Sequence, residues 1–197
     1  MPPYVTSSVV GGTGSAEPVA RVPVMFLWVG IPEPHKRPLL AIDALGELVR
    51  RGVDAELAFA GVHPAPLRAQ LRERVAAARL ESRVRYLDRI DDADLTRRYA
   101  GSVLVATSSI EGFGLPLVEA ILAGGRVAAT PTAAYRDAVG DVAMFAADAS
   151  VGAVADAMDA ALGRLPSAAD RARLAERFGA PAVAAALLSA YRDLVRA

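Results

Sequence analysis

Short apolar runs alternate with amphipathic stretches along most of the chain, and this alternation constrains the fold more than any other feature. Residues 24–30 (VMFLWVG) form an uninterrupted apolar run that ends in glycine, which is typical of a buried central strand. Residues 37–51 carry apolar side chains at helical spacing. Repeated strand and helix units of this kind favour an α/β fold, in which a doubly wound parallel sheet has helices on both faces.

The same pattern sets the expected elements and boundaries. Further strands are predicted at residues 55–62, 83–87, 102–107, 126–130 and 142–145. Helices are predicted between the strands at residues 37–51, 65–79, 93–100 and 115–123, and beyond them in Ala-rich segments at 151–162, 168–177 and 181–195. Residues 1–23, rich in Gly, Ser, Thr and Pro, are predicted to be a flexible N-terminal tail or linker. The prediction is one Rossmann-like domain at residues 24–197 with extra C-terminal helices.

The composition excludes several kinds of chemistry. The 197 residues include no cysteine, so disulfides, thiolate metal sites and cysteine nucleophiles are ruled out. With only two histidines in the chain, no metal site is expected. Lys+Arg and Asp+Glu are both 22, so the net charge of +0 does not favour nucleic acid as a partner. The sequence shows no secretory signal and no apolar run of about 20 residues, so we expect a cytoplasmic protein without a transmembrane segment.

The most informative segment for function is residues 108–125 (SSIEGFGLPLVEAILAGG). It follows a predicted strand and enters a predicted helix whose first turn is marked by Pro116. Gly112 and Gly114 therefore lie in a strand-to-helix turn at the carboxyl end of a strand, where doubly wound sheets bind ligands. Backbone N–H groups at such a helix start favour a phosphate or pyrophosphate. The groups expected to do so here belong to Phe113, Gly114 and Leu115.

Two carboxylates flank this turn. Glu111 precedes it, and Glu119 lies in the helix 8 positions later. Carboxylates are good acceptors for vicinal hydroxyl groups. A diphosphate bound in the turn with a polyol on each side has the layout of a sugar nucleotide, so we expect a nucleotide sugar as ligand.

With this turn and its two acids, the sequence resembles the C-terminal, donor-binding half of a retaining GT-B glycosyltransferase of family 4. The family's E-x7-E block appears as EGFGLPLVE, followed by AILAGGRVAAT and DAVGDVAMF. Its first signature, a strand, a glycine and a loop with a phosphate-binding lysine, appears as FLWVGIPEPHKRPLLAIDAL, with Lys36 at the matching position. The middle signature appears as RVRYLDRIDDADLTRRYAG. The resemblance covers about residues 24–191 and implies one half of a GT-B fold.

The resemblance also implies roles for individual residues. Glu111 would contact the hydroxyls of the donor sugar, and Glu119 would bind the ribose. Lys36 would offset the pyrophosphate charge, which makes Glu111 and Lys36 the implied catalytic residues. The donor would be a nucleotide sugar such as UDP- or GDP-hexose, without a cofactor or metal. Further contacts to the donor are implied for Gly30, Arg89 and Ile90.

Two departures from the family pattern matter. Ile31 stands where an arginine often provides a second phosphate clamp in the family, so either His35 or Arg37 compensates or the clamp is reduced. A complete enzyme of this class also has an N-terminal acceptor-binding domain, for which 197 residues leave no room. We therefore expect half of an active site, inactive without an N-terminal domain or partner chain. The alternatives are a non-catalytic nucleotide-sugar-binding or assembly subunit of a split glycosyltransferase, and another GT-B enzyme such as a phosphorylase or an epimerase.

Overall fold

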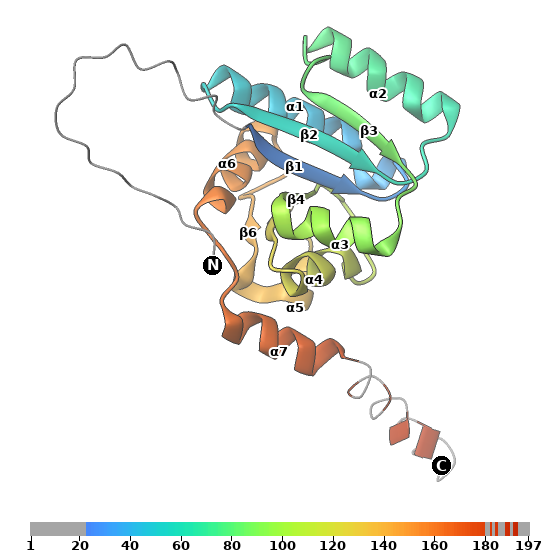
Figure 1. Ribbon diagram of the computed structural model, residues 1–197, viewed down its shortest axis with the longest axis vertical. Coiled ribbons are helices and arrows are strands. Elements are labelled where there is room, and N and C mark those ends of the chain that lie inside the picture. Colours follow the sequence, from blue (N-terminus) through green and yellow to red (C-terminus); the bar gives the residue numbers. More distant parts are fainter. Residues whose placement is uncertain (1–22, 180–181, 183, 185–187, 190, 193–197) are drawn as a thin grey trace, which may run out of the picture.

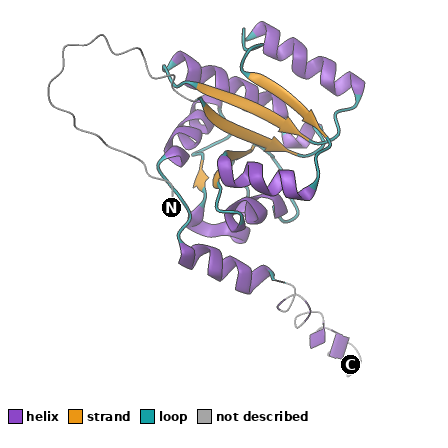
Figure 2. Ribbon diagram, in the orientation of Figure 1, coloured by secondary structure: helices purple, strands orange, loops and turns teal. Residues whose placement is uncertain are grey.

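The computed structural model describes residues 23–179, 182, 184, 188–189 and 191–192. Its strands form one parallel sheet in the order β3-β2-β1-β4-β5-β6 (Figures 1 and 2). The predicted doubly wound, Rossmann-like sheet is thus confirmed, and the strand order reverses between β1 and β4. The strands are β1 (Val24–Val29), β2 (Ala55–Ala60), β3 (Val84–Asp88), β4 (Val103–Ala106), β5 (Arg126–Ala129) and β6 (Met144–Phe145).

Helices cover both faces of the sheet because successive side chains of each strand point to opposite sides. Phe26 and Trp28 of β1 pack on one side with the buried side chains of α1, α2 and α6. Leu27 packs on the other side with those of α3, α4, α5 and α7. The helices are α1 (Pro38–Arg50), α2 (Ala65–Ala77), α3 (Asp92–Gly101), α4 (Leu115–Leu122), α5 (Ala133–Val139), α6 (Val151–Leu162) and α7 (Ala168–Phe178).

The predicted segment 142–145 is only partly a strand. Val142 lies in a 3-10 helix, η2 (Gly140–Val142), and β6 contains only Met144 and Phe145. The sequence prediction also missed α5, a helix of 7 residues that is too short to show a clear period. Its start depends on Thr132, whose hydroxyl accepts a hydrogen bond from the Tyr135 N–H at 3.3 Å.

The first two strands end earlier than predicted, and glycine is the reason in both cases. β1 ends at Val29 because Gly30 has φ +140°, and β2 ends at Ala60 because Gly61 has φ +132°. The two glycines also touch, since a Cβ on Gly61 would lie 2.3 Å from the carbonyl oxygen of Gly30. Glycine at position 61 therefore allows the ends of β1 and β2 to approach each other closely.

Two predictions concern parts of the chain that the structure does not describe. The predicted tail at residues 1–23 lies outside the described residues except for Pro23, and so does much of the predicted helix 181–195. Among the helices that are described, none combines the length and apolar character needed to span a bilayer.

Candidate functional site

The loops that follow β1 and β4 meet where the strand order reverses, and Thr107 ties them together. Its Oγ1 accepts a hydrogen bond from Trp28 Nε1 at 3.1 Å and donates to the carbonyl oxygens of Lys36 and Arg37 at 2.8 and 3.0 Å. The Ser109 N–H donates to the His35 carbonyl at 2.8 Å. The short 3-10 helix η1 (Pro34–Lys36) is thereby fixed against the start of the β4–α4 loop.

Lys36 lies over the end of β1. Its Nζ is 3.1 Å from the place that a Cβ of Gly30 would occupy. In the described part of the chain, no carboxylate comes within ion-pair distance of this ammonium. Lys36 is also the single lysine in a sequence of 22 basic residues. An uncompensated cation at the switch point is suited to binding an anion.

Lys36 and Glu111 line the same small hollow, of about 70 Å³, which we call the Lys36 hollow. Glu111 Oε1 accepts hydrogen bonds from the Ser108 hydroxyl at 3.0 Å and the Tyr135 hydroxyl at 3.1 Å. Ser108 is itself held by Thr130, whose hydroxyl donates to the Ser108 carbonyl at 2.6 Å. The structure therefore brings together the two residues that the resemblance implies to be catalytic.

The predicted anion-binding turn has the expected backbone geometry. α4 begins at Leu115, and Gly114 before it adopts the left-handed conformation with φ 94°. Pro116 is the second helical residue rather than the first. Among the described residues, no backbone acceptor is bonded to the N–H groups of Phe113, Gly114 or Leu115. These groups therefore remain available at the positive end of the α4 dipole.

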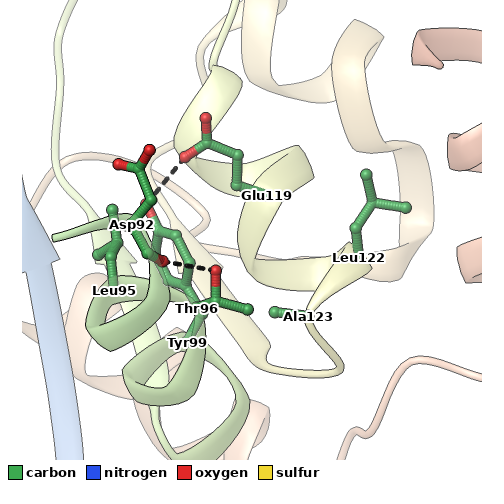
Figure 3. Close-up of a pocket in the computed structure, with 7 residues that line it drawn as sticks. All are labelled: Asp92, Leu95, Thr96, Tyr99, Glu119, Leu122 and Ala123. Carbon is green, nitrogen blue, oxygen red and sulfur yellow. Dashed lines mark hydrogen bonds between the residues drawn. The ribbon is translucent and has the colours of Figure 1, made fainter. Parts of the chain in front are cut away.

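Glu119 lines a separate hollow between α3 and α4, of about 500 Å³, which we call the Glu119 hollow (Figure 3). Its Oε2 accepts a hydrogen bond from the Tyr99 hydroxyl at 3.2 Å, and the two side chains point toward each other from α4 and α3. Burial is the main cause that raises the pKa of the Tyr99 hydroxyl, and the nearby Glu119 carboxylate raises it further. The hydroxyl therefore stays protonated. The other residues lining the hollow are Asp92, Leu95, Thr96, Leu122 and Ala123.

A third hollow, of about 200 Å³, lies beyond the ends of β1 and β2 and contains Arg89 and Ile90; we call it the Ile90 hollow. Val29 lines both this hollow and the Lys36 hollow. Leu95 lines both this hollow and the Glu119 hollow. Neighbouring hollows thus share a lining residue, and the residues that line the three hollows include Gly30, Lys36, Arg89, Ile90, Glu111 and Glu119.

Other predicted residues lie outside the three hollows. Gly112, Phe113 and Leu115 are exposed on the turn, and the Phe113 ring packs edge-on against Phe178 of α7 with centroids 5.1 Å apart. His35 is exposed beside Glu33. The Arg37 guanidinium donates to the Ala149 carbonyl at 3.2 Å.

The sequence prediction missed Tyr99, Tyr135 and Gly61. Tyr99 stands within the middle signature and is fully buried, but its contact with Glu119 joins residues 20 positions apart. Tyr135 lies on α5, which was not predicted. Gly61 follows a predicted strand, and a glycine at a strand end was the available signal for a close backbone approach.

The fold and the site place this chain among the doubly wound α/β proteins with polar groups at the switch point of the sheet. The sequence matches the family of glycosyl transferases group 1 over residues 18–178, and the chain belongs to this family. It is 35% identical over 111 residues to phosphatidyl-myo-inositol mannosyltransferase of Mycobacterium tuberculosis, which covers 55% of this chain and 28% of the relative. It is 34% identical over 96 residues to the serotype-specific mannosyltransferase WbdA of Escherichia coli, covering 48% of this chain and 12% of the relative.

Several solved structures share the fold of this chain. Anabaena HepE in complex with UDP and glucose superposes with a TM-score of 0.76 at 17% identity, over 87% of this chain and 48% of that one. Sucrose-phosphate synthase from Thermosynechococcus elongatus gives a TM-score of 0.78 at 23% identity, over 88% and 46%. The chain thus spans about half of these glycosyltransferase structures, which have the GT-B fold.

Proposed function

We propose that this chain is the donor-binding half of a retaining glycosyltransferase of family 4, and that its carboxyl edge binds a nucleoside diphosphate sugar. The placement of the charged and polar groups carries the proposal, because the β1–α1 loop supplies one ammonium and the β4–α4 loop with α4 supplies a set of free N–H groups and two carboxylates. The relatives support it: two are named mannosyltransferases, and HepE was solved with UDP and glucose. We therefore propose that the donor carries a hexosyl group, and the names of these relatives favour a mannosyl group.

The parts of the donor are assigned by chemistry. The sugar lies at the mouth of the Lys36 hollow, with its hydroxyls on Glu111. The pyrophosphate lies between Lys36, Gly30 and the start of α4, where both charge and N–H groups are available. The ribose hydroxyls bind Glu119 in the Glu119 hollow, and the base lies against Arg89 and Ile90.

In the proposed reaction, the bond between the anomeric carbon and the diphosphate oxygen breaks, and the sugar becomes oxocarbenium-like. Negative charge then accumulates on the leaving nucleoside diphosphate. Lys36 and the N–H groups at the start of α4 stabilise that charge without a metal ion or cofactor. Glu111 orients the sugar so that the acceptor oxygen bonds to the same face, and the acceptor proton leaves with the diphosphate.

An acceptor-binding half is proposed to close over this edge. The exposed apolar side chains around the site fit such a closure, because exposure of apolar surface to water is unfavourable and a second domain would bury it. They come from the loops after β1, β2 and β4 and from the start of α4, and they are Ile31, Val62, Ile110, Phe113 and Leu115. Closure would exclude water and bring the acceptor to the donor carbon.

The two acids provide the test of this assignment. Glu119→Ala is expected to weaken binding of UDP or GDP by about 1–3 kcal/mol, because the ribose loses a charged acceptor. Glu111→Ala is expected to leave the nucleoside diphosphates almost unaffected and to weaken only their glucose and mannose conjugates. Calorimetric titration of both variants with all four ligands measures the difference.

Glu81→Ala is the matched control, since Glu81 is exposed in the α2–β3 connection, away from the three hollows. It should bind every ligand as the unaltered chain does. Equal losses for nucleoside diphosphate and sugar conjugate in both site variants would refute the separate roles of the two acids.

A further inference from the structure

Each of the two site acids accepts a hydrogen bond from a buried tyrosine. Tyr135 donates to Glu111 Oε1 at 3.1 Å, and Tyr99 donates to Glu119 Oε2 at 3.2 Å. Both tyrosines are buried, with only 3% of each residue exposed. The two tyrosines come from different helices, α5 and α3, and neither lies in the E-x7-E segment that carries the acids.

Tyr135 contacts both ends of the anion-binding turn. Its hydroxyl lies 2.9 Å from Ser108 Oγ and 3.1 Å from Glu111 Oε1. A Cβ on Gly114 would lie 2.7 Å from the Tyr135 ring, so the ring packs directly against the glycine backbone. Tyr135 therefore holds the Glu111 carboxylate, together with the Ser108 hydroxyl, in a fixed position relative to the start of α4.

Tyr99 is held by the packing of α3 against α4. A Cβ on Gly125, just after α4, would lie 2.0 Å from the Tyr99 carbonyl oxygen, so the two backbones are in contact there. The ring points into the Glu119 hollow and reaches the acid from below (Figure 3). The hydrogen bond from Tyr99 thus fixes the Glu119 carboxylate relative to α3.

The chemistry of each pair leaves the acid able to bind ligand. Burial raises the pKa of both tyrosine hydroxyls, so each remains a proton donor. An ionised carboxylate has two oxygens, and within the described residues the tyrosine contacts involve one oxygen of each acid. The hydrogen bond from the tyrosine to one oxygen restrains rotation of the acid side chain. The other carboxylate oxygen stays available to accept a hydrogen bond from a ligand hydroxyl.

We propose that Tyr99 and Tyr135 are positioning residues, each acting through one acid, so that Tyr99 governs binding of the nucleoside part and Tyr135 governs binding of the sugar. The inference rests on the proposed function, because it uses the ribose and sugar roles of Glu119 and Glu111. It adds that the selectivity for each half of the donor is set from outside the E-x7-E segment.

Tyr→Phe substitutions test this directly, because they remove the hydroxyl and keep the ring packing. Tyr99→Phe is expected to weaken UDP or GDP and their sugar conjugates alike, by about fivefold. Tyr135→Phe is expected to leave the nucleoside diphosphates unchanged and to weaken the conjugates by about fivefold. Calorimetric titration gives the affinities, and thermal unfolding shows whether the variants remain folded.

Tyr86→Phe is the matched control, because the described residues offer no hydrogen-bond partner to the buried Tyr86 hydroxyl and it lies away from both acids. It should bind all ligands as the unaltered chain does. Two outcomes overturn the inference while leaving the proposed function standing: tyrosine variants that bind like the unaltered chain, or a Tyr135→Phe variant that loses nucleoside diphosphates and sugar conjugates equally. An unaltered chain that binds no nucleoside diphosphate overturns the proposed function and the inference together.

Discussion

Replacing Gly61 by alanine is expected to lower the free energy of unfolding by about 3 kcal/mol, since a strained φ and a backbone collision coincide. Gly61 has φ +132°, and its added Cβ would lie 2.3 Å from the Gly30 carbonyl oxygen. Neither backbone can yield easily, because both glycines end central strands of the sheet. Thermal unfolding should show a melting temperature lower by about 6–12 °C.

Gly52→Ala separates the two causes. Gly52 has φ +87°, but nothing lies within 4 Å of the Cβ position, so only the backbone strain applies. We expect about 1 kcal/mol for this control. If Gly61→Ala destabilises the chain no more than Gly52→Ala does, the close contact between the ends of β1 and β2 is not as described.

Lys36→Met is expected to lower the affinity for nucleoside diphosphates by about 2 kcal/mol, or about 30-fold, because a charge-assisted contact to the pyrophosphate is lost. Methionine keeps much of the apolar stem of the side chain over Gly30. The Lys36 backbone carbonyl can still accept its bond from Thr107, so the loop should remain in place. Calorimetric titration with UDP and GDP at low salt measures the change.

Arg50→Met is the matched control, because it makes the same change in net charge at the end of α1. Arg50 lies toward the opposite edge of the sheet from Lys36 and forms an ion pair with Glu47. The affinity of this variant should be unchanged, because an exposed charge at that distance is screened. A similar loss in Arg50→Met and Lys36→Met would mean that overall charge, rather than the position of Lys36, governs binding.

Much of the fold could be predicted because apolar runs and helical spacing are local signals. The run VMFLWVG became β1 and the segment 151–162 became α6 with the predicted limits. The strand ends at Gly30 and Gly61 were placed late, since a positive φ cannot be read from a glycine alone. Helix α5 was missed because 7 residues give too little periodicity.

The site could be predicted only in part, for a similar reason. Glu111, Glu119 and Lys36 stand in signatures that the sequence shows directly, and the structure brings Lys36 and Glu111 into one hollow. The partners of the two acids come from elsewhere in the chain, since Tyr135 is 24 positions from Glu111. Contacts of this kind depend on how helices pack, which a single sequence does not specify.

Modification of Lys36 tests the central claim most directly, namely that a nucleoside diphosphate binds along the carboxyl edge. Lys36 is the single lysine of the sequence, so an amine-specific reagent followed by peptide mass analysis reports on one side chain. The reaction is run with a metal chelator, with and without millimolar UDP, GDP or ADP. We predict that at least one of these nucleotides slows the modification of Lys36 severalfold, and a rate that none of them changes would contradict binding along this edge.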